Sequence, residues 1–350
     1  MALNKISLDY YKETNVQILK HQEEFSLECG KSLPAIDIGY CTYGRLNTAG
    51  DNVVWICHAL TANADALDWW DGLVGPDKLF DPTKYFIVCA NILGSCYGST
   101  CPSTINPSTG NPYHKNFPLV TIRDMVNAHK ILCQHLKINQ IEVLIGGSMG
   151  GQQVLEWAIQ SPKLFNHIIP IATNAKHSPW GIAFNESQRM ALEADASLFS
   201  LEPNAGKKGL EAARAIAMLS YRHYNTYHQS QQDNITSKIE DYRASSYQRY
   251  QGMKLRKRFE PLAYYSISKS MDSHDVGRAR GGLKKALSLI QANTLVLSIT
   301  TDVLFPPVEQ KFIADHINRA KLKSIESVFG HDGFLIEYEQ LTKNIKEFLS

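Results

Sequence analysis

Ser148 stands in the run GGSMGG at residues 146–151, which fits the pattern G-x-S-x-G. The apolar run IEVLI comes directly before it, and an amphipathic segment follows. A serine on a sharp turn from strand to helix projects its hydroxyl above the sheet, and the positions two before and two after it must be small to avoid collision. Gly146 and Gly150 meet that requirement. The pattern predicts that Ser148 is a nucleophile; the alternative is an ordinary glycine-rich turn.

A serine nucleophile needs a histidine base and a carboxylate that orients the histidine. When the serine lies on such a turn, the partners follow in the order Ser, acid, His. Asp302 comes just after the strand-like run NTLVLSIT, and His331 lies in a glycine-flanked loop after the run at 323–329. We therefore predict Asp302 as the acid and His331 as the base. A structural role is expected for six other histidines, which lie in or beside helical or apolar segments: His167, His177, His223, His228, His274 and His316.

Acyl chemistry at a serine also requires hydrogen-bond donors for the developing oxyanion. In this arrangement one donor is the backbone N–H after the nucleophile, and the other comes from the loop after an earlier strand. Those positions are Met149 and Leu60, the latter at the end of the run VVWICHAL. His58 in the same run is expected to shape the loop rather than to act as the base.

The elements that position these residues alternate in type along the chain. Val- and Ile-rich runs, typical of buried parallel strands, lie at 53–57, 85–90, 141–145, 167–171 and 294–299. Helical patterns lie at 121–136 and 152–160, and Thr121 with Asp124 is typical of a capping box. This alternation with the serine turn predicts an α/β-hydrolase fold, a mostly parallel sheet flanked by helices.

Between residues 174 and 287 the strand-like runs disappear, and Ala, Gln, Tyr, Arg and Lys recur at helical spacing. The alternation of strand and helix resumes after this segment, so we expect an inserted helical lid rather than an independent domain. The predicted organisation is a core in two parts, 1–173 and 288–350, separated by a lid at 174–287.

Composition limits the classes of function. A chain of 350 residues with 44% apolar content can bury a large core, which excludes general disorder. The net charge of +2, with no basic stripe, argues against nucleic-acid binding. The first residues lack a signal-peptide core and no run is long enough to span a membrane, so a cytoplasmic location is expected. All seven cysteines fall within residues 1–133 without metal-binding spacing, so neither a metal site nor a disulfide framework is predicted.

Nearly the whole chain from Ser32 onward resembles the homoserine O-acyltransferases. The resemblance lies in long, specific strings: HALT (58–61), WWDGLVGP (69–76), GSTCPSTINPSTGNPY (98–113), FPLVTIRDMV (117–126), GGSMGG (146–151), AFNESQR (183–189), YQRYQGMKLRKRF (247–259), SITTDVLFPP (298–307) and GHDGFLIE (330–337). The segment at 61–68 departs from the more glycine- and serine-rich sequence of that family.

The resemblance implies the triad Ser148, Asp302 and His331, with Arg189 and Asp332 contacting homoserine. It also implies a homodimer formed through the lid and an acyl-enzyme made from acetyl-CoA or, in some members, succinyl-CoA, in methionine synthesis. Physical logic agrees, because a guanidinium can hold a substrate carboxylate while a carboxylate pairs with its ammonium. No bound cofactor is needed, since acetyl-CoA serves as a co-substrate.

Four alternatives remain open from the sequence. Succinyl-CoA is a possible donor, although no obvious cation for its second carboxylate is present in the acyl-pocket segments, which favours acetyl-CoA. Serine is a possible acceptor because it differs from homoserine by one methylene, worth only ~1–3 kcal/mol of discrimination. An esterase would use the same triad with water as acceptor. A non-catalytic binding protein of the same fold is disfavoured by the complete set of triad residues.

Overall fold

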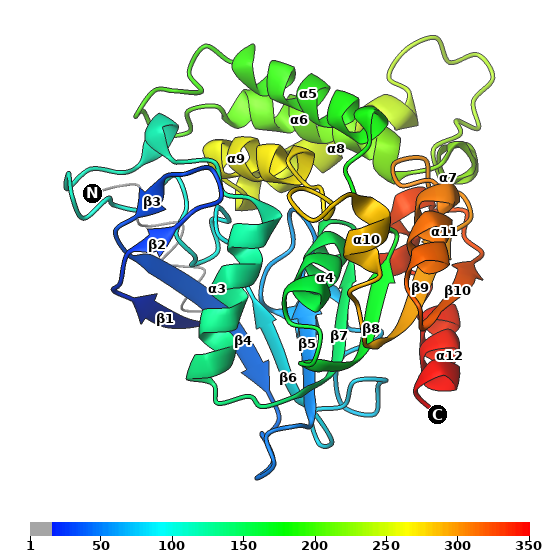
Figure 1. The fold of residues 1–350 in the computed structure, drawn as a ribbon. Helices are drawn as coiled ribbons and strands as arrows, with labels where there is room; N and C mark the ends of the chain where they lie inside the picture. The colour runs from blue at the N-terminus through cyan, green and yellow to red at the C-terminus, as the bar shows by residue number, and fades with distance from the viewer. Residues whose placement is uncertain (1–15) are drawn as a thin grey trace.

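An eight-stranded sheet runs through the computed structural model, which describes residues 16–350 (Figure 1). Its strand order is β1-β4-β6-β5-β7-β8-β9-β10. β4 pairs antiparallel with both of its neighbours, and the strands from β5 to β10 pair in parallel. The bounds are β1 Gln17–His21, β4 Ile36–Tyr43, β5 Val53–Cys57, β6 Phe86–Ala90, β7 Ile141–Gly147, β8 Phe165–Ile171, β9 Asn293–Ile299 and β10 Ala320–Ile325; a separate pair is formed by β2 Phe25–Ser26 and β3 Ser32–Leu33.

Helices cover both faces of the sheet, which explains why its central strands are continuous apolar runs. All five residues of β5 are buried, and alternate side chains enter two different core clusters. Val53 and Trp55 pack in the cluster that includes residues of α3 (Ile122–His135), α4 (Met149–Gln160) and α11 (Pro307–His316). Val54 and Ile56 pack in the cluster that includes residues of α2 (Ala66–Trp69) and α12 (Tyr338–Leu349).

The predicted fold class is confirmed, and most expected elements begin or end within two or three residues of those observed. The capping box of α3 is present, with Thr121 Oγ1 accepting from the Asp124 N–H and Asp124 accepting from the Thr121 N–H. The strand expected at 323–329 instead occupies 320–325, and a 3₁₀ helix, η2 (Gly330–Leu335), contains His331. The antiparallel edge formed by β1 and β4 was not anticipated, because β1 is largely exposed and lacks an apolar run.

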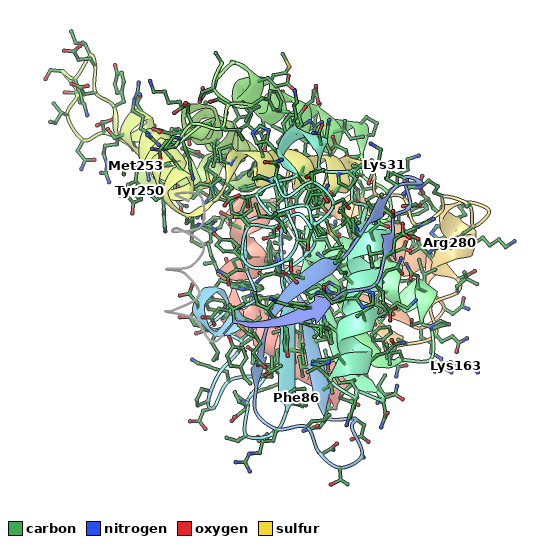
Figure 2. All side chains as sticks on the ribbon, turned by 90° about the vertical axis from the view of Figure 1, so that its left-hand side faces the viewer. Lys31, Phe86, Lys163, Tyr250, Met253 and Arg280 are labelled. Carbon is green, nitrogen blue, oxygen red and sulfur yellow. The ribbon has the colours of Figure 1, made fainter. Side chains whose placement is uncertain are left out.

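The chain between β8 and β9 forms helices, most of which build a layer above the sheet in Figure 1. Figure 2 labels Tyr250 and Met253 in this layer and Phe86, at the start of β6, near the far end of the sheet. The last helix of the segment, α10, instead packs against α4 and α11 of the core. The helices are α5 Pro179–Glu193, α6 Lys207–Tyr221, α7 Tyr224–Ser230, α8 Arg243–Arg258, α9 Pro261–Asp272 and α10 Leu283–Leu287.

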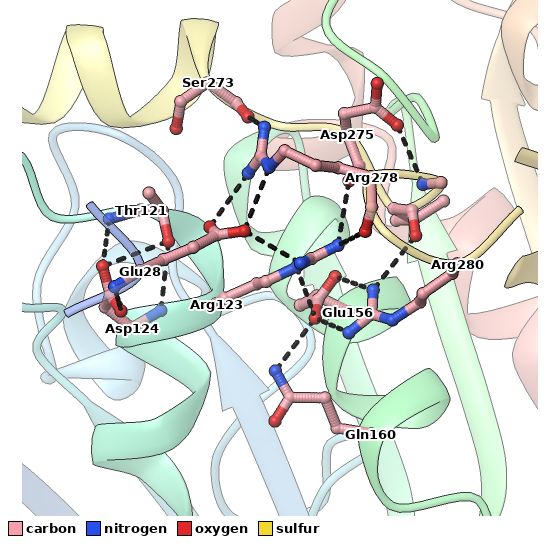
Figure 3. Close-up of polar contacts among 12 residues, drawn as sticks. Glu28, Thr121, Arg123, Asp124, Glu156, Gln160, Ser273, Asp275, Arg278 and Arg280 are labelled. Carbon is pink, nitrogen blue, oxygen red and sulfur yellow. Dashed lines mark hydrogen bonds and ion pairs between the residues drawn. The ribbon is translucent and has the colours of Figure 1, made fainter. Parts of the chain in front are cut away.

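A network of alternating charges joins the end of this helical segment to the core (Figure 3). Arg280, after α9, forms two hydrogen bonds with Glu156 of α4, at 2.8 and 2.5 Å. Arg123 of α3 lies 3.4 Å from the same carboxylate and 2.8 Å from Glu28. Glu28 in turn accepts two hydrogen bonds from Arg278, at 3.0 and 2.9 Å. The network fixes the returning chain against α3 and α4 and therefore anchors one end of the helical layer.

Within residues 16–350, no helix is both long and apolar enough to cross a bilayer.

Candidate active site

Ser148 lies at the turn between β7 and α4, with backbone angles φ 59° and ψ −126°. A non-glycine residue is strained in this region, and such strain persists only where the surroundings enforce it. The Ser148 N–H donates to Ile171 O at 2.9 Å, and Thr173 Oγ1 donates to Ser148 O at 2.8 Å. Although serine commonly caps helices, no cap hydrogen bond from its side chain forms within the described chain. The hydroxyl is therefore not committed to the helix that it precedes.

The glycines two residues before and after Ser148 allow close approach of neighbouring backbone. A Cβ on Gly150 would lie 2.1 Å from Cys57 O, at the end of β5. A Cβ on Gly146 would lie 2.6 Å from the backbone of Gly150 and 2.8 Å from Cys57 O. Both positions exclude any side chain, which is the steric demand that the sequence pattern predicts. Because neither glycine has a side chain, the first turn of α4 can pack directly against the end of β5.

Asp302 and His331 form a buried pair. His331 Nδ1 donates to Asp302 Oδ2 at 2.6 Å, and each residue is 3% exposed. The other carboxylate oxygen accepts from the backbone N–H groups of Leu304 and Phe305, at 2.8 and 2.9 Å. Burial of the imidazole opposes its protonation, but the charge and hydrogen bond of Asp302 prevail and raise the pKa of His331. The pair can hold the imidazole in one tautomer and stabilise its protonated form.

Aromatic packing connects this pair with the serine turn. The Phe334 ring lies 5.4 Å from that of His331, between centroids, and fills the space that a Cβ on Gly147 would occupy. Phe305 covers the imidazole at 5.1 Å with the rings tilted by 30°. Across residues 16–350, no hydrogen bond joins Ser148 Oγ to His331. Catalytic hydrogen bonds in ligand-free sites often tighten only when substrate binds.

Leu60 lies in the loop after β5, and Met149 lies at the start of α4. These two segments are in close contact at Gly150. Leu60 lies three residues after β5 and is 4% exposed, and Met149 is the first residue of α4 and fully buried. The first N–H groups of a helix have no partner within the helix, so the Met149 N–H is available to a ligand. The close contact of Gly150 with the end of β5 brings the backbone of these two segments together.

Asp332, next to His331, faces the end of α6. Its Oδ2 lies 3.0 Å from Arg222 Nε, but in the described structure this Nε–H is buried without an aligned hydrogen-bond acceptor. Burial raises the pKa of Asp332, although the charges of Arg222 and Arg214 oppose this effect. Arg214 also lies over the ring of Tyr221, at 5.1 Å from its centroid, and that ring is 5.8 Å from His331. The helical layer thus places two guanidinium groups near Asp332.

Arg222 and Arg214 are not predictable as site residues from the sequence. The chain contains 36 Lys and Arg residues, and no pattern around these two distinguishes them from the others. Only the folding of α6 over η2 places Arg222 beside Asp332.

Arg189, which the sequence analysis assigned to the substrate carboxylate, has several protein partners in the helical layer. Its Nε and Nη2 donate to Glu186, Nη2 also donates to Asp272 at 2.5 Å, and Nη1 donates to Ser268. The side chain is 4% exposed as a residue, and two carboxylates already balance its charge. Among the described residues no contact joins Arg189 to Asp332, whose ion pair is with Arg222. Arg189 and Asp332 thus have separate protein partners, and their expected contacts with homoserine stay a prediction.

The free cysteines are mostly buried, as expected for small apolar side chains. Cys41, Cys57, Cys89, Cys101 and Cys133 are buried, Cys96 is partly buried and Cys29 is exposed. Burial raises the pKa of Cys41 and of Cys101 to about 11, so these thiols stay protonated at neutral pH.

Residues 52–338 match the family model of the alpha/beta hydrolase fold. A homoserine O-acetyltransferase of Cyclobacterium marinum is 50% identical over 336 residues, covering 96% of this chain and 95% of that protein.

Among solved structures, esterase E22 has a TM-score of 0.88 at 23% identity, over 96% of this chain and 100% of that chain. A homoserine O-acetyltransferase from Bacillus anthracis has a TM-score of 0.86 at 24% identity, over 96% and 98%. Esterases and transferases therefore share the fold, so structural similarity does not distinguish them. The 50% sequence identity is to a homoserine O-acetyltransferase, and it indicates the family. The chain belongs to the homoserine O-acetyltransferase family of acyltransferases, within the α/β-hydrolase fold.

Proposed function

We propose that this protein transfers an acetyl group from acetyl-CoA to the hydroxyl of L-homoserine through an acyl-Ser148 intermediate, in methionine synthesis. The observation that carries the mechanism is the buried Asp302–His331 pair, with its 2.6 Å hydrogen bond, next to the serine turn. The names of the relatives supply the acceptor and the class of donor.

In the first half-reaction, Ser148 Oγ attacks the thioester carbonyl carbon while His331 Nε2 accepts the hydroxyl proton. The negative charge that develops on the carbonyl oxygen is stabilised by the N–H groups of Met149 and Leu60. The C–S bond then breaks, and coenzyme A leaves with the proton from His331. This step produces an ester at Ser148 and restores the neutral imidazole.

In the second half-reaction, the homoserine hydroxyl transfers its proton to His331 and attacks the acyl-serine carbonyl. The bond to Ser148 breaks, and Ser148 Oγ regains the proton as O-acetylhomoserine leaves. Each proton removed in one step returns in the next, so the cycle requires no redox or metal cofactor. Water is the competing acceptor, and the helical layer favours transfer by limiting its access.

Arg222 and Asp332 provide the groups that an amino-acid acceptor requires. We assign the homoserine carboxylate to Arg222, in place of Arg189, because its buried Nε–H lacks an aligned acceptor in the described chain. The ammonium is assigned to Asp332, which lies next to the base in the sequence. Together these contacts would direct the acceptor hydroxyl toward His331.

A homodimer through the helical layer is part of the proposal. Large apolar side chains are exposed on α5, on α6 and on the segment between them, and a dimer formed through this layer would cover them. These are Trp180, Met190, Phe199, Leu201 and Leu219, at 54, 62, 48, 67 and 58% exposure. Measurement of molar mass by light scattering tests the dimer. The cytoplasmic location expected from the sequence stays a prediction.

An esterase remains the second candidate, because esterase E22 shares the fold. A thiol-release assay that crosses acetyl-CoA and succinyl-CoA with homoserine, serine and water distinguishes the possibilities. We expect a burst with acetyl-CoA alone and sustained turnover only when homoserine is added. Sustained turnover with water alone would identify a hydrolase, and turnover with succinyl-CoA or serine would identify the alternative donor or acceptor.

A further inference from the structure

His58 is fully buried behind the loop that follows β5, and both of its ring nitrogens have backbone partners. Nδ1 lies 2.8 Å from Ala59 O, and Nε2 lies 3.1 Å from the N of Ile92. Because a carbonyl only accepts and an amide N–H only donates, Nδ1 carries the proton and Nε2 is the acceptor. The contacts therefore specify one neutral tautomer, and neither nitrogen is available as a general base.

The environment of His58 also favours its neutral form. Burial lowers the pKa of His58 to about 4, and the hydrogen bond to Ala59 O only partly offsets this effect. Protonation would turn Nε2 into a second donor directed at the Ile92 N–H, which would break that contact.

Two hydrogen bonds hold Ala59 O, from His58 Nδ1 at 2.8 Å and from the Ala62 N–H at 3.1 Å, and they determine the direction of the next N–H group. The Ala59 carbonyl and the Leu60 N–H belong to the same peptide unit, which is planar and trans, so they point in opposite directions. When the His58 ring holds the carbonyl on one side, the Leu60 N–H must point to the other side. Rotation of this peptide would turn the Leu60 N–H away from the oxyanion site. The same rotation would break the hydrogen bond between Ala59 O and His58.

A second side chain links this loop to the other donor of the oxyanion site. Gln153 Nε2 donates to both His58 O and Met149 O, at 3.2 Å each. Its Oε1 accepts from His129 Nε2 at 2.9 Å, which fixes the orientation of the amide. The carbonyl groups of the β5 loop and of the first residue of α4 therefore share one buried donor.

We infer that His58 is a positioning residue for the oxyanion site: its Nδ1–H fixes the Ala59–Leu60 peptide so that the Leu60 N–H faces the reacting carbonyl. The inference rests on the proposed function, which gives the Leu60 amide its role. His58 contacts neither substrate nor nucleophile in this assignment, and it acts only through the peptide that it holds.

Two substitutions remove the two hydrogen bonds separately. His58→Asn retains a donor near the position of Nδ1 and loses the acceptor for Ile92, whereas His58→Gln retains an acceptor near Nε2 and loses the donor to Ala59. Removal of a complete oxyanion donor commonly lowers kcat by ~10²–10³. We expect His58→Gln to lower the single-turnover acylation rate by ~10–100-fold and His58→Asn to lower it by less than about fivefold.

The decisive readout compares two ligands of each variant. Methylboronic acid forms a tetrahedral adduct with a catalytic serine and requires the oxyanion donors, whereas coenzyme A does not. His58→Gln should weaken binding of the boronic acid by at least about tenfold and leave coenzyme A binding within about twofold. Equal losses of acylation in both variants, or parallel weakening of both ligands, would show that His58 only supports the fold.

Two further measurements keep the test interpretable. If His58→Gln does not fold, Gln153→Met removes the shared donor to His58 O and Met149 O, and the same selective loss is expected; unchanged boronic acid affinity would overturn the inference. The wild-type acyl-enzyme is measured first by mass spectrometry. Its absence would contradict the proposed function, whereas its presence together with wild-type acylation by His58→Gln would contradict only the role of His58.

Discussion

Asp302→Asn should lower acylation by about 10⁴-fold, and the contacts of Asp302 explain why the asparagine must bind His331 in the wrong way. One carboxylate oxygen accepts from the N–H groups of Leu304 and Phe305, and the other accepts from His331 Nδ1. In the variant, the two backbone donors select the amide oxygen. The NH₂ group then faces Nδ1 and can only donate to it.

This arrangement moves the imidazole proton to Nε2, the nitrogen that must accept the proton of Ser148. The catalyst is then blocked in its resting state, rather than merely less well oriented. A 10⁴-fold decrease corresponds to about 5 kcal/mol of activation free energy, at roughly 1.36 kcal/mol for each tenfold change. The fold should be retained, because the amide preserves the shape of the side chain and both of its backbone contacts.

The assay is rapid-mixing measurement of coenzyme A release without homoserine, combined with thermal unfolding. Glu309→Gln is the matched control, because Glu309 is a carboxylate whose charge acts on Asp302 but which accepts a hydrogen bond from Asn174, outside the triad. The control should acylate within about threefold of wild type. A correctly folded Asp302→Asn protein that loses less than tenfold would refute the reasoning and require another acid.

Four other outcomes are expected. Ser148→Ala should show neither a burst nor an added acetyl mass by mass spectrometry, and a labelled variant would exclude Ser148 as the nucleophile. Arg222→Gln should retain the burst but lower kcat/KM for homoserine by ~10–200-fold, which corresponds to the ~1.5–3 kcal/mol of a charge-assisted contact. Arg189→Gln should instead lower Tm. If Arg189→Gln lowers kcat/KM for homoserine and Arg222→Gln lowers only Tm, Arg189 is the substrate residue. Because the pKa of His331 is raised above 6.5 and its neutral form is the base, acylation should decrease as pH falls, with a midpoint above 6.5; a lower midpoint would contradict this sign. Glu156→Gln should lower the free energy of unfolding in urea by about 3–5 kcal/mol, because Glu156 is 1% exposed and pairs with two arginines; a loss below about 1 kcal/mol would mean that water replaces it.

Local physical signals explain what could be predicted from the sequence. The run Val53–Cys57 is apolar throughout because the strand is buried on both faces, and it is observed with the expected bounds. The turn at Ser148 was recognisable because backbone contact at Gly146 and Gly150 excludes side chains. Each constraint falls on a few adjacent residues and leaves a readable pattern, although the backbone that Gly146 and Gly150 contact at Cys57 is distant in the sequence.

Features that depend on long-range folding were not predictable in the same way. The pairing of β1 with β4 rests mainly on backbone hydrogen bonds, which place little demand on side-chain type. The partner of Asp332 is decided by the packing of α6 on η2, more than a hundred residues later in the chain. The resemblance in sequence led to Arg189, whose contacts with Glu186 and Asp272 only the three-dimensional arrangement could reveal.

The charge network of Figure 3 has a consequence for the order of events during synthesis on the ribosome. Glu28 and Arg278 are separated by 250 residues, and Arg280 must reach Glu156 from the same late segment. At about 5–20 residues per second, roughly 12–50 s separate the appearance of Glu28 from that of its partner. Glu156 precedes Arg280 by 124 residues, so roughly 6–25 s pass at the same rate before its bidentate partner is synthesised. Until the last fifth of the protein emerges, Arg123 is therefore the only cation of this network that the nascent chain can offer to Glu28 and Glu156.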